Sequence, residues 1–333
     1  STLTLSGANT HTGATDVAFG RLVIAGTGSL VGAGGVHSDV TVRAGGRLEV
    51  NGGGLAQVAS LNVQSGGELV NNGSIEGFGA SITIAGAAVS NVKMNDATDI
   101  NVSAGGTLDA QGELSAPLVV NAGTLTVTGA LTGVGTGPHV GPIDLVRNVG
   151  VGQTQINAAF TGLTDFVNTS TSASAVNVAA AGQLVAGGDV INSAGTFTNA
   201  GVTTAVGDIR NAAGATLTTT NKLNAAGDVI NAGTMNAAGE LSSADLVNTG
   251  AFTVTGALTG VGTGPHVGPI DLVRNAGAGT MQINAAFTGL TDFVNSSAGA
   301  NAVNVAAAGQ LVAGGDVINS AGTFTNAGVT TAG

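Results

Sequence analysis

A short unit of Asp, two mostly apolar residues and Asn recurs four times in the second half of the chain, and it constrains the fold more than any other feature. Its occurrences begin at Asp189, Asp208, Asp228 and Asp245, which are 17 to 20 residues apart. A repeat of this length with no helical pattern inside it is typical of a solenoid in which each unit forms one coil. The predicted fold is therefore all-β, a right-handed parallel β-solenoid (β-helix) of about 17 coils.

The middle of the unit indicates which side chains face the core, because side chains alternate along a strand. Arg210 occupies a position that is aliphatic in the other units, and an arginine at that position points to solvent. The outward residues are then Ile191, Arg210, Ile230 and Val247, and the buried ones are Val190, Ile209, Val229 and Leu246. The closing Asn also points inward, so we expect the Asn side chains to hydrogen-bond from coil to coil as amide ladders do.

Composition indicates the kind of core that the chain can form and excludes some classes of partner. The chain has 57 Gly and no Cys, Trp or Tyr, and small or β-branched apolar residues suit a narrow core of stacked side chains. Eight basic residues stand against 19 acidic ones, for a net charge of −11, so no basic stripe exists for nucleic acid or an anionic membrane surface. Gly, Thr, Asn or Asp interrupts every apolar stretch, so we expect no membrane insertion of this segment.

One long block of sequence is duplicated. Residues 126–205 recur at 253–332, an offset of 127 without a gap, and the two copies differ at only eight positions. We therefore divide the chain into residues 1–125, 126–252 and 253–333, which we expect to form one continuous solenoid. If the copies fold alike, the offset spans a whole number of coils, six or seven.

Residues 133–142, which recur as residues 260–269, depart from the coil rhythm and hold four of the five prolines. Proline cannot serve a central ladder position, so the stretch is predicted to leave the solenoid as a loop or a broken coil. Its single histidines favour exposed polarity over metal binding. The candidate contact residues are Pro138, His139, Pro142, Pro265, His266 and Pro269. These loops either contact a ligand or a neighbouring chain, or merely interrupt the stack.

The four Asp residues that open the repeated units would stack at about 4.8 Å if the register holds. Like charges at that spacing repel, so the column either splays into water or binds a cation such as calcium. The weak calcium candidates are Asp189, Asp208, Asp228 and Asp245. We expect no other metal, no cofactor and no catalytic residues, because the bases are scattered and no compact acid–base pair is evident.

Residues 1–24 read Ser-Thr-Leu-Thr-Leu-Ser-Gly-Ala-Asn-Thr-His-Thr-Gly and continue to Arg21-Leu-Val-Ile. This segment resembles the passenger-associated transport repeat of autotransporter adhesins, with His11 where Tyr is usual and Asp16 where Thr is common. The coils after it resemble haemagglutinin-like β-helix repeats. The resemblance implies a secreted β-helix stalk at the bacterial cell surface.

Two functions follow as expectations. The first is a non-enzymatic, secreted or cell-surface structural protein, an adhesin stalk or passenger of the autotransporter type. The alternative is a self-assembling extracellular fibre or biofilm matrix protein, built by end-to-end or lateral stacking of solenoids. The partner is then a surface or matrix ligand, or further copies of the chain, and the location is extracellular or the bacterial cell surface.

Overall fold

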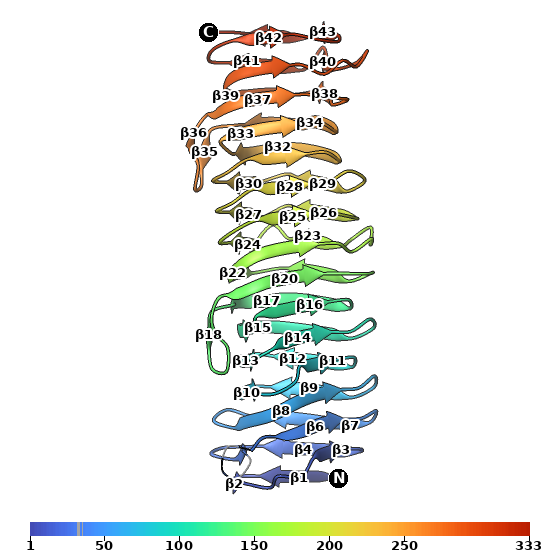
Figure 1. The fold of residues 1–333 in the computed structure, drawn as a ribbon, viewed down its shortest axis with the longest axis vertical. Coiled ribbons are helices and arrows are strands. Elements are labelled where there is room, and N and C mark those ends of the chain that lie inside the picture. The colour runs from blue at the N-terminus through green and yellow to red at the C-terminus, as the bar shows by residue number, and fades with distance from the viewer. Residues whose placement is uncertain (32–33, 35) are drawn as a thin grey trace. The chain divides into compact units, whose positions relative to one another are not determined.

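The computed structural model of the chain consists of short β-strands joined by turns, and it describes residues 1–31, 34 and 36–333 (Figure 1). Apart from two short hairpins, the strands pair in parallel with the equivalent strands of the next coil. For example, β25 (Val190–Asn192) pairs with β28 (Ile209–Asn211), which pairs with β31 (Val229–Asn231). The described residues contain no α-helix. The fold is therefore the predicted parallel β-solenoid, with about 16 turns.

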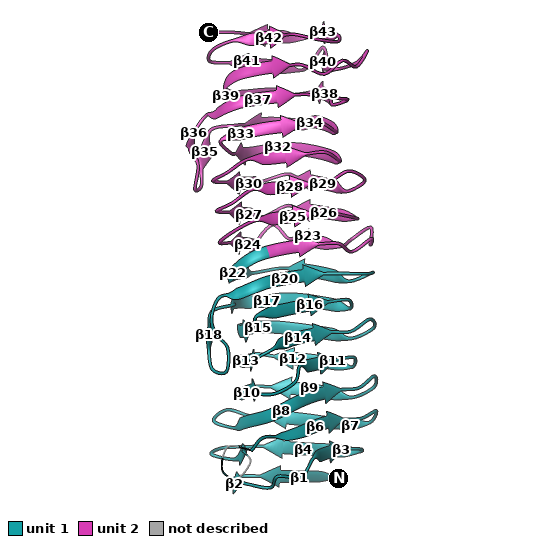
Figure 2. Ribbon diagram, viewed as in Figure 1, with its two compact units in different colours: residues 1–165 teal, residues 166–333 magenta. Residues whose placement is uncertain are grey.

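The chain divides into two compact units, residues 1–165 and residues 166–333 (Figure 2). The strands that lie in the first unit are β1 (Thr2–Leu5), β2 (Ala8–Asn9), β3 (Thr15–Val17), β4 (Gly20–Ile24), β5 (Ser29–Leu30), β6 (Ser38–Val42), β7 (Gly46–Val50), β8 (Leu55–Val63), β9 (Glu68–Asn71), β10 (Ser74–Gly77), β11 (Ile82–Ile84), β12 (Ala87–Ser90), β13 (Lys93–Asp96), β14 (Asp99–Val102), β15 (Thr107–Ser115), β16 (Leu118–Asn121), β17 (Thr124–Thr132), β18 (Gly135–Thr136), β19 (Val140–Gly141), β20 (Ile143–Asn148) and β21 (Gln153–Ile156). Strand β22 (Ala159–Asn168) contains the boundary.

The second unit repeats the same construction. Besides β25, β28 and β31, its strands are β23 (Val176–Val178), β24 (Gln183–Ala186), β26 (Thr196–Asn199), β27 (Val202–Ala205), β29 (Thr216–Thr219), β30 (Lys222–Ala225), β32 (Thr234–Ser242), β33 (Asp245–Asn248), β34 (Ala251–Thr259), β35 (Gly262–Thr263), β36 (Val267–Gly268), β37 (Ile270–Asn275), β38 (Thr280–Ile283), β39 (Ala286–Asn295), β40 (Val303–Val305), β41 (Gln310–Ala313), β42 (Val317–Asn319), β43 (Phe324–Asn326) and β44 (Val329–Thr331). The duplicated block begins inside β17 in one copy and inside β34 in the other.

Three strands and three turns make one coil. In the coil that contains β25, β26 and β27, each strand pairs with its counterpart in the next coil, which is β28, β29 and β30 respectively. Side chains alternate between core and solvent, as the repeated unit predicts. The predicted inward residues Val190, Ile209, Val229 and Leu246 are at most 2% exposed, whereas Ile191, Arg210, Ile230 and Val247 lie outside the buried core. The strand register is therefore confirmed.

The predicted asparagine ladder is also present. In the second unit the Asn at the end of each repeated unit donates its Nδ2 to the Oδ1 of the equivalent Asn in the next coil, at 2.7 to 2.9 Å, along the column Asn168, Asn192, Asn211, Asn231, Asn248, Asn275, Asn295 and Asn319. The same amides donate to backbone carbonyls, as Asn231 does to Ala251 at 2.9 Å, so these buried polar groups are satisfied. Six steps carry the ladder from Asn168 to Asn295, which are 127 residues apart. One period of the duplication therefore equals six coils.

Coil length is less uniform than the repeated unit suggests. The step from Asn121 to Asn148 takes 27 residues, and so does the step from Asn248 to Asn275. Both of these coils contain a proline-rich stretch that leaves the stack. These two coils use residues that would otherwise build part of another one, and the solenoid has about 16 turns.

Candidate contact site formed by two hairpins

The proline-rich stretch of the first unit leaves the solenoid between β17 and β20 as a small β-hairpin, residues 133–142, which we call the first hairpin (Figure 1). Gly135 and Thr136 pair in antiparallel with Gly141 and Val140. Its prolines, Pro138 and Pro142, lie outside these paired positions, as the missing N–H group of proline requires. The stretch therefore leaves the stack as predicted, and it is a paired ribbon rather than a broken coil.

The second unit carries the same element at residues 260–269, the second hairpin. Gly262 and Thr263 pair with Gly268 and Val267, the same register as in the first hairpin. The predicted contact residues thus come together as two separate triplets, one in each hairpin: Pro138, His139 and Pro142, and Pro265, His266 and Pro269.

Each hairpin folds back onto four polar side chains of earlier coils, which we call its seat. The first seat comprises Lys93, Asn95, Glu113 and Ser115, and the second comprises Lys222, Asn224, Glu240 and Ser242. In the first seat, the side-chain amide of Asn95 makes two hydrogen bonds to the main chain of His139. Asn95 Nδ2 donates to the carbonyl oxygen of His139 at 2.8 Å, and the N–H of His139 donates to Asn95 Oδ1 at 2.8 Å.

The other two residues of the first seat, Glu113 and Ser115, bind the first strand of the hairpin and the residues before it. Thr136 Oγ1 donates to Glu113 Oε2 at 2.8 Å, and Ser115 Oγ donates to the carbonyl oxygen of Gly133 at 2.8 Å. A Cβ atom on Gly135 would lie 2.5 Å from Ser115 Oγ, so a glycine is needed where the ribbon meets the seat. Docking therefore depends on close backbone approach as well as on hydrogen bonds.

The second seat holds its hairpin with the same residue types. The N–H and the Oγ1 of Thr263 both donate to Glu240 Oε1 at 3.0 Å, and Lys222 Nζ donates to Thr263 Oγ1 at 2.9 Å. Ser242 Oγ donates to the carbonyl oxygen of His266 at 2.8 Å. The contacts differ in detail, since Ser242 bonds the His266 carbonyl in the second seat whereas Asn95 bonds that of His139 in the first, but in both units Thr136 or Thr263 is held by the seat glutamate.

The seats are the part of the site that sequence reasoning missed. Lys93 and Lys222 are the only lysines in the chain, and each opens a Lys-x-Asn segment that is followed by a Glu-x-Ser segment. Both lysines are neutralised, since Lys93 Nζ lies 2.6 Å from a carboxylate oxygen of Glu76 and Lys222 Nζ lies 3.5 Å from one of Glu240. The repeated lysine was the signal that could have revealed the seats.

Each histidine side chain makes a hydrogen bond within its own hairpin. His139 Nε2 lies 2.9 Å from the carbonyl oxygen of Pro142, and His266 Nε2 lies 3.0 Å from that of Pro269. Within the residues that the structure describes, no group of three or more acids, histidines or cysteines could hold a metal ion. The imidazoles therefore brace the turn of each ribbon.

The outer side of each hairpin is apolar. Val140 is 77% exposed, and its counterpart Val267 is 79% exposed. Val134 and Val261, at the start of the two hairpins, are each about half exposed. Each hairpin therefore presents two exposed valines from a loop that is held on a rigid scaffold, a place where recognition residues often lie.

The aspartate column has a role in the backbone ladder. The N–H of Asp208 donates to Asp189 Oδ1 at 2.8 Å, the N–H of Asp228 donates to Asp208 Oδ1 at 2.8 Å, and the N–H of Asp245 donates to Asp228 Oδ1 at 3.2 Å. Each carboxylate thus accepts a hydrogen bond from the next coil instead of converging with its neighbours on one point. Arg210 donates to Asp208 Oδ2 at 2.6 Å and offsets part of the repulsion. The column offers no group of the size a calcium site needs within the described residues.

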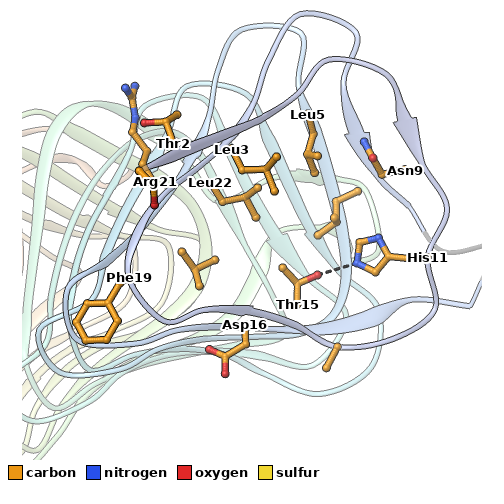
Figure 3. A pocket seen from close by; sticks show the side chains of 14 residues that line it. Thr2, Leu3, Leu5, Asn9, His11, Thr15, Asp16, Phe19, Arg21 and Leu22 are labelled. Atoms are coloured by element: carbon orange, nitrogen blue, oxygen red, sulfur yellow. Dashed lines mark hydrogen bonds between the residues drawn. The ribbon is translucent and has the colours of Figure 1, made fainter.

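A cavity of about 510 Å³ opens at the first coil of the first unit (Figure 3). Apolar residues, with Leu3 and Leu22 in view, make up half of its lining, and several of its polar side chains pair with one another or with neighbouring residues. His11 Nε2 lies 2.8 Å from Thr15 Oγ1, and Asp16 pairs with Arg43 at 2.8 Å. The cavity therefore shows no paired acid and base aimed at a common point.

Comparisons with known proteins identify no family for this chain. No protein-family model matches it, and no curated protein matches it. None of the described residues belongs to a helix of the length and hydrophobicity that a membrane span requires. The resemblance of residues 1–24 to an autotransporter passenger stays a prediction.

Proposed function

We propose that this chain is a non-enzymatic structural protein of the extracellular space or bacterial cell surface, an adhesin stalk or passenger of the autotransporter type. In this proposal the solenoid is the scaffold, and the hairpins are its contact surfaces for a surface or matrix ligand. The observation that carries it is the docked hairpin, which both units build with the same sequence, the same four seat residue types and the same outward valine.

The placement of charge supports a structural role. Six of the eight basic residues pair with carboxylates, and most of these pairs join different coils, as Arg21 does with Glu49 and Arg47 does with Glu68. Bases committed to coil-to-coil ion pairs stabilise a stack. They leave the acids without the free partners that general acid–base chemistry uses.

The test replaces the outward valine of both hairpins by aspartate, Val140→Asp together with Val267→Asp. Beads coated with the purified chain are measured for adhesion to fibronectin, collagen and mucin surfaces. We expect adhesion to at least one of the three, with a loss of tenfold or more in the double variant. The matched control is Val151→Asp, which places the same charge at a turn valine that is 67% exposed.

Two outcomes would contradict this function. If the wild-type beads adhere to none of the three surfaces, the chain is not an adhesin for these ligands. If the double variant and the control reduce adhesion equally, the hairpins are spacers. Circular dichroism of each variant shows whether the β-structure is intact in either case.

A second function, a self-assembling extracellular fibre or matrix protein, is favoured by a different observation. One face of the second unit carries aliphatic side chains at six of eight successive outward positions, where a solvated strand normally carries polar ones. This row is separate from the hairpins, and the next section develops it.

A further inference from the structure

Eight outward side chains form a single column along one face of the second unit. They follow one another in direct register from strand to strand: Val167, Ile191, Arg210, Ile230, Val247, Arg274, Val294 and Ile318. Six of the eight are Val or Ile, and we call this column the aliphatic stripe. The alternation of each strand points these six side chains away from the core, and none of them belongs to the buried core.

Another face of the same unit provides an internal comparison. Its outward column is equally continuous and consists of hydroxyl and amide side chains: Asn177, Thr198, Thr218, Asn236, Thr253, Gln282, Asn304 and Thr325. Both columns sit on parallel strands of the same coils and meet the same steric demands. Strand propensity alone therefore accounts for β-branched residues on both faces, but not for the absence of hydroxyls from one of them.

The borders of the stripe suit close packing against a second sheet. On one side, the positions directly after the inward asparagines carry small residues: Ser193, Ala212, Ala232, Thr249, Ala276, Ser296 and Ser320. On the other side runs the aspartate column. Small side chains let another sheet approach to about 10 Å, the ordinary distance between packed sheets.

Charge on this face is left uncompensated. Arg274 is exposed in the middle of the stripe, and in the described part of the chain no carboxylate lies within ion-pairing distance of it. Nearby, burial raises the pKa of the Asp245 carboxyl, and repulsion from Asp228 and Asp271 raises it further. One surface thus carries an arginine that is unpaired within the described residues, Arg274, and a group of closely spaced aspartates, Asp228, Asp245 and Asp271.

We propose that the aliphatic stripe is a homotypic interface on which a second copy of this chain packs its own stripe. Charge selects the arrangement. A copy whose strands run in the opposite direction places its aspartate column over the small-residue border of the first copy, within reach of Arg274. A copy whose strands run in the same direction would set one aspartate column against the other. The proposal rests on the self-assembling function described above and not on the hairpins.

Sedimentation velocity of the purified chain tests this interface. Wild type is expected to sediment as a dimer or larger species, and Val247→Asp is expected to weaken association by tenfold or more. The matched control is Thr253→Asp, which adds the same charge to the same coil on the threonine-rich face and is expected to leave association unchanged. Arg274→Glu is expected to weaken association, and added salt to weaken it in wild type but less in Arg274→Glu.

A monomeric wild type at the highest soluble concentration would overturn the proposal, as would equal behaviour of Val247→Asp and Thr253→Asp. The hairpin double variant is measured in parallel. Association that survives in it, and is lost in Val247→Asp, supports the stripe whatever the adhesion experiment shows. Association lost only in the hairpin variant would place the contact between chains at the hairpins and would refute the stripe.

Discussion

Asp96 differs from the other inward polar residues of the first unit because it is an acid. Its side chain is fully buried, and Oδ1 accepts hydrogen bonds from the N–H and the Oγ1 of Thr98 at 2.8 and 2.7 Å. Within the described structure Oδ2 has no hydrogen-bond partner. Burial raises the pKa of the Asp96 carboxyl, and the bonds from Thr98 and Asp99 oppose this rise only in part.

The raised pKa predicts how stability depends on pH. Folding favours the protonated form of Asp96, so the free-energy cost of its burial is absent below the ordinary pKa of aspartate, grows between that pKa and the raised folded-state pKa, and is constant above it. Asp96→Asn should therefore raise the free energy of unfolding at neutral pH by on the order of 1 kcal/mol, and change it little in acid. Urea unfolding at the two pH values measures this, and a gain of equal size at both would contradict the ionisation argument.

The alternation of inward and outward residues predicts opposite outcomes at neighbouring positions. Val229 is 1% exposed, whereas Ile230 points outward. Val229→Asp should lower the free energy of unfolding by about 3 kcal/mol or more, because it buries an unpaired charge. Ile230→Asp should change it by about 0.5 kcal/mol or less. Urea unfolding in dilute solution, where chains do not associate, compares the two, and equal losses would refute the register.

At the scale of elements, the sequence was enough to predict the coils but not the seats. A coil is specified locally: Arg210 among aliphatic residues identifies the outward position, and the inward Asn follows from alternation. A seat is specified by residues that lie far from the hairpin in sequence, as Asn95 lies 44 residues from His139. Periodicity does not reveal it, because Lys93 and Lys222 are offset by 129 residues and not by the 127 of the duplicated block.

The contacts of the aspartate column likewise could not be predicted from the sequence. Stacking of Asp189, Asp208 and Asp228 followed from the repeat, and so did their mutual repulsion. The sequence did not show that each carboxylate accepts the N–H of the next aspartate, since that depends on the path of the turn before the strand. Only the coordinates of a turn decide whether its side chain faces water, a cation or the backbone.

At the scale of the whole molecule, the 127-residue period is the natural increment of length. Residues 160–165 and 287–292 have the same sequence, so deletion of residues 166–292 joins Asp165 to Phe293 in native sequence context. It removes one period, which equals six steps of the asparagine ladder. We expect the shortened chain to fold with an unchanged β-type circular dichroism per residue.

The control is deletion of residues 166–282. This deletion removes ten residues fewer than one period and therefore joins the coils out of register. This variant should lose stability or aggregate, because removal of a fraction of a coil places strand residues where the neighbouring coil has turns, so the coils no longer pair with one another. Similar thermal unfolding of the two deletions would show that length is not counted in whole coils.

The seat residues of both hairpins precede the hairpins in sequence, and only the base of each hairpin also bonds a later coil, where the N–H groups of Gly133 and Gly260 donate to the carbonyl oxygens of Thr161 and Thr288 at 2.7 Å. Thr263 meets Lys222, 41 residues earlier, just as His139 meets Asn95. A chain that folds from its N-terminus therefore has each seat built before the hairpin that fills it is made. A chain that folds from its C-terminus must keep an apolar ribbon undocked while about 40 further residues arrive. The docked hairpin thus gives the molecule a preferred direction of growth.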